Sequence, residues 1–242
     1  MWLKAPTDIN GIKLLPNEVH VWRENLDNVM PLLELTRILS EDELVRARRF
    51  HFEQHRQRFI AARGILRNIL SRYLNIEASK INFGYEARGK PFLDQNFHEN
   101  NLKFNVSHSQ NFALYAVSLN NFIGVDLECI SSTTDVVSLA QRFFTPSEFA
   151  VIESAPQEQQ QQLFFRYWTC KEAYLKATGT GLKDLQKVEI SLTLEQPAEL
   201  MIPNIPNSGE WSLQEIKPFS NCASAIAVNR RDLQFKYWDY GS

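Results

Sequence analysis

Cysteine is scarce in this chain, with only three among 242 residues. Cys129, Cys170 and Cys222 show no metal-binding spacing, and an odd number of thiols cannot all pair within one chain. Scattered cysteines of this kind are typical of proteins in a reducing compartment and untypical of disulfide-stabilised secreted folds. We therefore expect a cytoplasmic protein.

Long hydrophobic runs and a strong charge of one sign are missing as well. No segment approaches the roughly 18 consecutive apolar residues that a membrane-spanning helix needs, and residues 1–6 lack the apolar stretch of a signal peptide. The formal net charge is −2, which provides no overall attraction to nucleic acid or to an anionic membrane. A soluble protein that binds neither partner is expected.

A glycine-rich phosphate loop is also absent, because the pattern G-x-x-x-x-G-K-[ST] occurs nowhere in the chain. This absence argues against a phosphotransferase of the common kind that uses nucleoside triphosphates. Hydrophobic residues make up 44% and charged residues 22% of the chain, as in an ordinary globular protein. The length is sufficient for a large core in one or two domains.

The most informative stretch present is residues 164–182. The sequence predicts that its first part is a helix, which ends at Gly179. Trp168, Glu172 and Lys176 are spaced four apart and therefore lie on one ridge of that helix. An acid and a base are thus placed within an aromatic segment. The alternative is an ordinary surface pair between Glu172 and Lys176, which stabilises a helix by a few tenths of a kcal/mol.

A second acidic cluster lies in residues 123–128, which we expect to form a hairpin with residues 112–119. In a strand, residues two apart share a face, so Asp126 and Glu128 should project together. Two adjacent carboxylates repel each other unless a cation lies between them, and a hard divalent ion completed by substrate phosphates suits such a pair. The alternative is a strand end whose acids face solvent.

These two segments together resemble the signature motifs of the 4′-phosphopantetheinyl transferases. The motifs are Gly124-Val125-Asp126-Leu127-Glu128 and, further along, Trp168-Thr169-Cys170-Lys171-Glu172-Ala173-Tyr174-Leu175-Lys176. The length of the chain and its upstream motifs are similar to the Sfp-type class, which activates carrier proteins of fatty-acid, polyketide and nonribosomal peptide synthases.

The resemblance implies a holo-[acyl-carrier-protein] synthase activity. Such an enzyme moves the 4′-phosphopantetheine group from coenzyme A to a serine of an apo carrier protein or carrier domain and releases adenosine 3′,5′-bisphosphate. The cofactor would be Mg²⁺, with Mn²⁺ as a possible substitute, and the class implies a monomer. The alternative is a non-catalytic module on the same fold that binds coenzyme A or a carrier protein.

The resemblance also implies the residues of a metal site. Asp126, Glu128 and Glu172 would hold the cation on the pyrophosphate, and Lys176 would neutralise phosphate charge. The base that takes the serine proton is either Glu172 or Glu148, and this choice stays open. Residues 145–148 also read as a capping box in which Glu148 is the third helical residue, which gives it a structural alternative.

Coenzyme A would be bound by Arg46, Lys90, Pro91, Ser107 and His108, according to the same resemblance. Each has an ordinary alternative: a solvated helix face for the arginine, a simple turn for Gly89-Lys90-Pro91, and a surface histidine for His108.

Two further positions enter as expectations. Glu43 stands where relatives carry a basic residue, and a capping box with Ser40 explains it better. A carrier protein would dock on a basic or apolar rim, for which the candidates are Arg142 and Phe143-Phe144.

The fold class expected is α+β. Two capping boxes, each followed by a long helix and later by a similar apolar strand, indicate an internal repeat. We expect a pseudo-twofold pair of α/β lobes, each a small, mainly antiparallel sheet packed with helices, with the active site in the cleft between them. The lobes are placed at residues 1–128 and 139–242, with a linker at 129–138.

Overall fold

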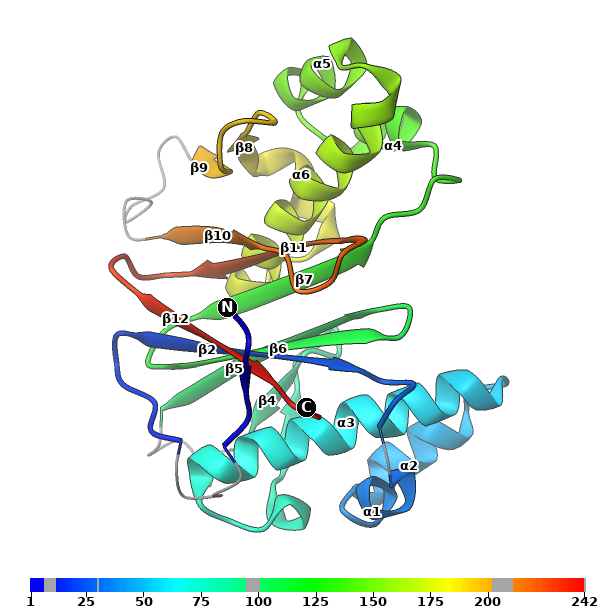
Figure 1. Cartoon of the computed structure of the whole chain (residues 1–242), viewed down its shortest axis with the longest axis vertical. Helices are drawn as coiled ribbons and strands as arrows, with labels where there is room; N and C mark the ends of the chain where they lie inside the picture. The colour runs from blue at the N-terminus through cyan, green and yellow to red at the C-terminus, as the bar shows by residue number, and fades with distance from the viewer. Residues whose placement is uncertain (7–11, 30, 95–100, 202–210, 242) are drawn as a thin grey trace. The chain divides into compact units, whose positions relative to one another are not determined.

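The computed structural model describes residues 1–6, 12–29, 31–94, 101–201 and 211–241. These residues form two compact units, coloured by chain position in Figure 1. Unit 1 comprises Met1–Lys103, Asn111–Asn120 and Gln234–Ser242, and unit 2 comprises Phe104–Gln110 and Asn121–Leu233. Each unit is therefore assembled from separate stretches of the chain. None of the helices in the described ranges is long and apolar enough to cross a membrane.

Unit 1 contains a mixed sheet in the order β1-β12-β2-β6. Its strands are β1 (Leu3–Lys4), β2 (Glu18–Asn25), β6 (Phe112–Leu119) and β12 (Gln234–Asp239). Strands β2 and β6 are antiparallel, whereas β12 runs parallel to both β1 and β2. The mainly antiparallel sheet that we expected is therefore mixed in this unit, because the strand from the far end of the chain enters it in parallel.

Among the helices of unit 1, α2 (Glu41–Arg48) begins at the predicted capping box. The helices are α1 (Leu32–Arg37), α2, α3 (Glu53–Leu74) and the short 3₁₀ helix η1 (Ala78–Lys80), followed by β3 (Phe83–Tyr85) and β4 (Pro91–Leu93). At the start of α2, the Ser40 amide donates to the Glu43 carboxylate at 3.1 Å, which confirms the expected capping box. Helix α3 ends at Asn75 in the left-handed conformation.

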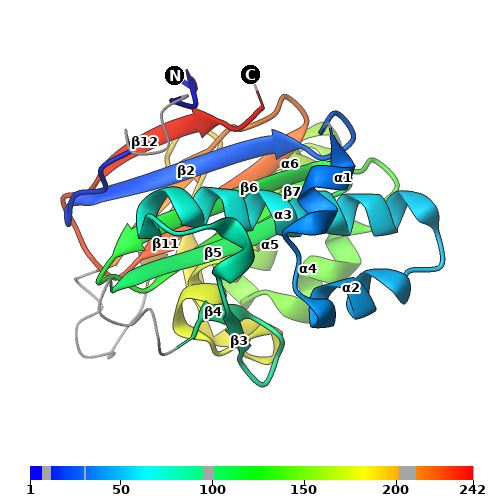
Figure 2. The ribbon, with the colours of Figure 1, turned by 90° about the horizontal axis from the view of Figure 1, so that it is seen from below.

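Helix α3 lies along the sheet of unit 1 (Figure 2). The Tyr115 hydroxyl of β6 donates to the Ala62 carbonyl oxygen at 3.0 Å, and the Trp22 indole of β2 donates to the Tyr73 hydroxyl at 2.9 Å. Both rings are fully buried at their inner positions. These two hydrogen bonds attach the helix to the strands at two points.

Unit 2 contains an antiparallel sheet in the order β10-β11-β7. Its strands and helices are β5 (Leu102–Ser109, whose first two residues belong to unit 1), β7 (Ile123–Cys129), α4 (Val136–Phe143), α5 (Pro146–Ser154), α6 (Gln157–Thr178), η3 (Leu182–Lys187), β8 (Glu189–Ser191), β9 (Glu199–Met201), β10 (Ser212–Ile216) and β11 (Cys222–Val228). Helix α6 ends at Gly179 with φ of +74°, which confirms the predicted C-cap.

Helix α6 packs on β7 and β11 (Figure 1), and it approaches closely at Gly124 of β7 and at the alanines of β11. A Cβ added at Gly124 would overlap the Ala173 carbonyl oxygen and lie 2.5 Å from the Ala177 amide nitrogen. On β11, the partners of Gly124, Asp126 and Glu128 are all alanines. The absence of bulk on this face lets the helix backbone approach the sheet closely.

The structure agrees with two predicted α/β lobes and differs in how the chain divides between them. Each unit combines a small sheet with one helix of 22 residues, α3 and α6. The predicted lobe boundaries do not coincide with the units, because β7 lies in unit 2 and residues 234–242 lie in unit 1. The segment expected as a linker, residues 129–138, contains the end of β7 and the start of α4.

The predicted hairpin between residues 112–119 and 123–128 is wrong. Strand β6 pairs with β2, and β7 pairs with β11. Both segments are strands, as their apolar alternation predicts, and Asn120 adopts the left-handed conformation that a tight turn would use. Strand pairing depends on residues far away in the chain, so this local pattern could not decide the partner.

Candidate active site

Strand β7 places two acids on the face that α6 covers. Asp126 is only 3% exposed, and Glu128 lies two residues further along the same face. Their partners across the sheet, Ala225 and Ala223, leave room beside them. The predicted common face of Asp126 and Glu128 is confirmed.

Lys176 of helix α6 reaches into this group. Its Nζ lies 2.6 Å from Asp126 Oδ1 and also donates to Ser107 Oγ at 3.0 Å and to the Val125 carbonyl oxygen at 3.2 Å. Ser107 in turn donates to Asp126 Oδ1 at 3.0 Å. The helix, β5 and β7 thus meet around one carboxylate.

Glu172, one turn before Lys176, carries the most perturbed carboxyl of the group. Burial, followed by the charges of Asp126 and Glu128, raises the pKa of Glu172 to about 7, although Lys176 acts in the opposite direction. Burial and then Asp126 also raise the pKa of Glu128. These mutual effects show that Asp126, Glu128 and Glu172 lie within electrostatic range of one another.

The donor set suits a hard cation in its chemistry. Two buried carboxylate oxygens, Asp126 Oδ2 and Glu172 Oε1, have no hydrogen-bond partner among the described residues. Buried carboxylate oxygens without partners are costly, and a cation is one way to satisfy them. Among the described residues, no three His, Cys, Asp or Glu side chains are nevertheless arranged so that they could hold a metal ion by themselves. Mg²⁺ does not need such a group, because it usually takes one or two carboxylates together with waters and substrate phosphates.

Glu148 has a structural position at the start of α5. Its carboxylate accepts the Thr145 amide at 2.9 Å, the Ile190 amide at 2.8 Å and the ammonium of Lys171 at 2.5 Å. Glu148 and Lys171 are both almost completely buried. Both carboxylate oxygens are therefore occupied by capping and by an ion pair, which favours the capping-box interpretation of this residue.

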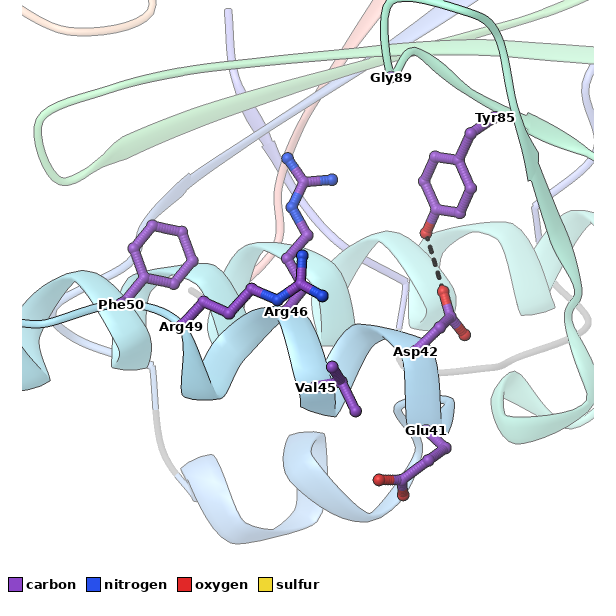
Figure 3. Close-up of a pocket in the computed structure, with 8 residues that line it drawn as sticks. All are labelled: Glu41, Asp42, Val45, Arg46, Arg49, Phe50, Tyr85 and Gly89. Carbon is purple, nitrogen blue, oxygen red and sulfur yellow. Dashed lines mark hydrogen bonds between the residues drawn. The ribbon is translucent and has the colours of Figure 1, made fainter.

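Unit 1 contains a cavity of about 710 Å³ beside α2 (Figure 3). Arg46, Arg49 and Phe50 line it from one end of α2, and Tyr85 and Gly89 line it from the β3–β4 hairpin. Gly89 has φ of +80°, so the turn needs a glycine there. The predicted residues Lys90 and Pro91 follow directly in the same turn, both half-buried.

Two other arginines, Arg63 and Arg67, pair with Glu43 and do not line this cavity. The Glu43 carboxylate lies 2.7 Å from Arg67 Nε and 3.5 Å from Arg63 Nε, and Arg67 also donates to the carbonyl oxygens of Ala78 and Ile81. Arg67 and Glu43 are each 1% exposed. This pair is part of the core, so the cationic groups of the cavity come from Arg46 and Arg49.

The structure separates two residues that the sequence placed side by side. Ser107 faces Asp126, whereas His108 is its neighbour on β5 and is exposed on the opposite face. Arg49, Tyr85 and Ser109 were not among the predicted site residues. Arg49 stands three residues after Arg46, at helical spacing, and this signal could have identified it.

The expected docking rim is only partly on the surface. Phe144 is 3% exposed and stacks on Phe164 at a centroid distance of 5.2 Å, so it belongs to the core of unit 2. The Arg142 guanidinium lies over the Phe143 ring at 4.9 Å, and both side chains remain accessible.

Comparison with known proteins places most of the chain in one family. Residues 122–229 match the model of the 4′-phosphopantetheinyl transferase superfamily, and residues 22–120 match the model named 4′-phosphopantetheinyl transferase, N-terminal. The chain is 50% identical over 240 residues to the 4′-phosphopantetheinyl transferase HetI of Nostoc sp., covering 99% of this chain and 98% of that protein.

More distant relatives carry related names. The 4′-phosphopantetheinyl transferase psf-1 of Bacillus pumilus is 29% identical, with 81% of this chain and 79% of that protein covered. The human L-aminoadipate-semialdehyde dehydrogenase-phosphopantetheinyl transferase is 28% identical, with 81% and 69% covered. A solved holo-(acyl-carrier-protein) synthase of Bacillus anthracis in complex with CoA (3′,5′-ADP) covers 44% of this chain and 92% of its own, at 22% identity and a TM-score of 0.36.

The family models and the relative that matches almost the whole chain define a phosphopantetheine-transferring enzyme. The chain belongs to the 4′-phosphopantetheinyl transferase superfamily, whose members transfer phosphopantetheine to carrier proteins.

Proposed function

We propose that this enzyme transfers 4′-phosphopantetheine from coenzyme A to a serine of an apo carrier protein in a Mg²⁺-dependent reaction, releasing adenosine 3′,5′-bisphosphate. The observation that carries the proposal is the convergence of Asp126, Glu128 and Glu172 around the ammonium of Lys176 in unit 2. Such a mixed group suits a pyrophosphate, whose negative charge needs cationic partners while the reaction proceeds.

The three carboxylates are proposed to hold the cation. When bound, Mg²⁺ would supply charge stabilisation on the phosphate oxygens as a Lewis acid. Lys176 would contribute a second positive charge from the chain itself, at a position that Ser107 and the Val125 carbonyl oxygen hold in place.

Glu172 is the better candidate for the general base. One of its oxygens has no hydrogen-bond partner among the described residues, so that oxygen is free to accept a proton. Glu148, by contrast, already accepts three hydrogen bonds. In the step proposed, the carboxylate of Glu172 takes the proton of the carrier serine, and the serine oxygen attacks the phosphorus that carries the pantetheine arm. The bond from that phosphorus to the adenosine bisphosphate breaks.

The cavity of unit 1 is proposed to take the nucleotide part of coenzyme A. Arg46 and Arg49 would pair with its 3′-phosphate, and Tyr85 offers a ring for adenine. Lys90 and Pro91 would act from the adjoining turn. Ser107 remains a proposed contact to the pyrophosphate, whereas His108, on the opposite face of β5, is proposed to contact another part of coenzyme A. Donation by Ser107 would require its proton to leave Asp126.

The test is intact-mass analysis of an apo acyl carrier protein incubated with the enzyme, coenzyme A and Mg²⁺. We expect the carrier mass to increase by one phosphopantetheine group and the increase to disappear with EDTA. Glu172→Gln should abolish transfer, and Glu153→Gln, at an exposed position of α5, should not. Full transfer in EDTA would refute the metal dependence, and full transfer by Glu172→Gln would refute the role of Glu172.

A further inference from the structure

The free edge of strand β7 is satisfied by side chains. In the described part of unit 2, β7 pairs with β11 on one side, and β5 is not its backbone partner on the other. Three alternate residues of β5 instead accept the β7 amides. Asn105 Oδ1 accepts from Val125 at 2.8 Å, Ser107 Oγ from Leu127 at 3.2 Å, and Ser109 Oγ from Cys129 at 3.0 Å.

Two of these three residues, Ser107 and Ser109, also donate a hydrogen bond to an acidic side chain of β7. A serine hydroxyl has one proton to donate and accepts with its lone pairs. Because Ser109 Oγ accepts the Cys129 amide, its own proton points elsewhere, and the hydroxyl donates to Glu128 Oε2 at an oxygen–oxygen distance of 3.0 Å. Ser107 treats Asp126 in the same way, at 3.0 Å. Each hydroxyl therefore joins an acid to the amide of the residue that follows it.

The third position provides a natural comparison. Asn105 accepts the Val125 amide in the same manner, but the preceding residue of β7 is Gly124, which has no side chain to orient. Asn105 is therefore an edge contact alone. Substitution of Asn105 therefore measures the general cost of leaving a β7 amide without its acceptor. Any additional loss of cation binding on substitution of a serine can be separated from that cost.

We propose that Ser109 is a positioning residue that orients the carboxylate of Glu128 toward the cation. The inference rests on the proposed metal role of the acidic group and adds a residue to it. Ser109 does not touch the cation and acts through the hydrogen bond to Glu128. The hydroxyl suits this role because the backbone of β7 fixes its oxygen, and the carboxylate then has a preferred rotamer.

Removal of the hydroxyl should weaken cation binding more than it weakens the fold. Without Ser109, the Glu128 carboxylate loses the hydrogen-bond donor that the described structure gives it and can rotate. Loss of an outer partner of a metal-ligating carboxylate typically lowers metal affinity by about 10–100-fold.

The experiment measures binding of Mn²⁺ to the full chain with coenzyme A present, following free Mn²⁺ by electron paramagnetic resonance. We expect Ser109→Ala to weaken Mn²⁺ binding by about 10–100-fold. Asn105→Ala should weaken it by less than about threefold, because that residue touches no acid, and its melting temperature should decrease as much as that of Ser109→Ala.

A matched pair keeps the test decisive if the alanine variants do not fold. Ser109→Thr retains the hydroxyl and should bind Mn²⁺ almost as the parent does. Ser109→Val has nearly the shape of the threonine variant but no hydroxyl, and it should bind Mn²⁺ weakly. Equal binding by the threonine and valine variants would overturn the positioning role alone. No Mn²⁺ binding by the parent protein would overturn the metal assignment and this inference with it.

Discussion

Lys176 Nζ lies 2.6 Å from Asp126 Oδ1 and joins the last turn of α6 to the middle of β7. Asp126 is almost fully buried, while the side chain of Lys176 is 28% exposed. The ammonium therefore compensates a buried carboxylate from the solvent side of the acidic group. A bound cation would supply charge to the same group, so Lys176 and Mg²⁺ are expected to act partly in place of each other.

Substitution Lys176→Met should destabilise the protein by about 2 kcal/mol, because the buried Asp126 carboxylate loses the ammonium that donates to it. Mg²⁺ should restore more stability in this variant than in the parent, since the cation supplies the missing charge. Urea unfolding with and without Mg²⁺ measures both effects, and Lys183→Met, at an exposed position, is the control. Equal stabilisation of all three proteins by Mg²⁺ would contradict the coupling.

The raised pKa of Glu172 predicts how stability depends on pH. In the folded protein this pKa is about 7, whereas the ordinary value is 4.5. Below both values the carboxyl is neutral in both states and carries no penalty. Between them only the unfolded chain ionises, so the parent loses stability as pH rises through this window.

Glu172→Gln removes that penalty, because the amide stays neutral at every pH. We expect the variant to be more stable than the parent by about 2–3 kcal/mol at pH 8 and to have equal stability at pH 4. Denaturant unfolding across this range is the measurement, with Glu153→Gln as the exposed control. A constant difference between the two curves would contradict the assignment of the titration to Glu172.

Gly124→Ala should displace helix α6 from the sheet. The new methyl group would meet the Ala173 carbonyl oxygen and the Ala177 amide nitrogen, both of which are helix backbone and cannot rotate away. Overpacking of this kind typically costs about 1–3 kcal/mol, and the shift would also move Glu172 and Lys176 away from β7. We expect a lower melting temperature together with loss of transfer. Normal transfer by a folded variant would show that close approach is not required.

Cys129 and Cys222 should form a disulfide on treatment with a mild thiol oxidant such as diamide. They are directly opposite each other on β7 and β11, and their sulfur atoms lie 3.0 Å apart. Each thiol loses a proton, and the two electrons reduce the azo bond of the reagent. The reaction should be slow, because burial raises the pKa of the Cys222 thiol.

Peptide mapping after alkylation measures that pairing. We expect Cys129 and Cys222 to be linked and Cys170 to remain a free thiol, because Cys170 is buried within α6. Cys222→Ser should abolish the linkage, and Cys170→Ser should leave it unchanged. A linkage that involves Cys170 would contradict the described packing of unit 2.

Local sequence signals were sufficient for much of the fold. The capping boxes at Ser40 and Thr145 and the C-cap at Gly179 lie where they were predicted, because capping depends on residues three or four apart. The common face of Asp126 and Glu128 follows from the strand period in the same way. These features need no knowledge of the rest of the chain.

Other features depend on contacts that local signals do not encode. The apolar alternation identified β6 and β7 as strands but gave the wrong pairing, since the partners β2 and β11 lie far away in the sequence. No local signal distinguishes Arg67 from the other arginines of α3, and only its buried contact with Glu43 shows that it belongs to the core. The sequence did not identify Ser109, because the resemblance assigned the coenzyme A contacts to its neighbours Ser107 and His108.

By itself, the sequence determined most of the long helices and strands, the position of the acids on their strand and helix, and the family to which the chain belongs. Periodicity and capping act over a few residues, and the two motifs are written directly in the chain. Only the tertiary structure decided three contacts of these acids. Lys176 donates to Asp126, and Lys171 donates to Glu148. Ser109 donates to Glu128. Each of these contacts joins elements separated by many residues, and the packing of α6 and β5 against β7 brings them within hydrogen-bond distance.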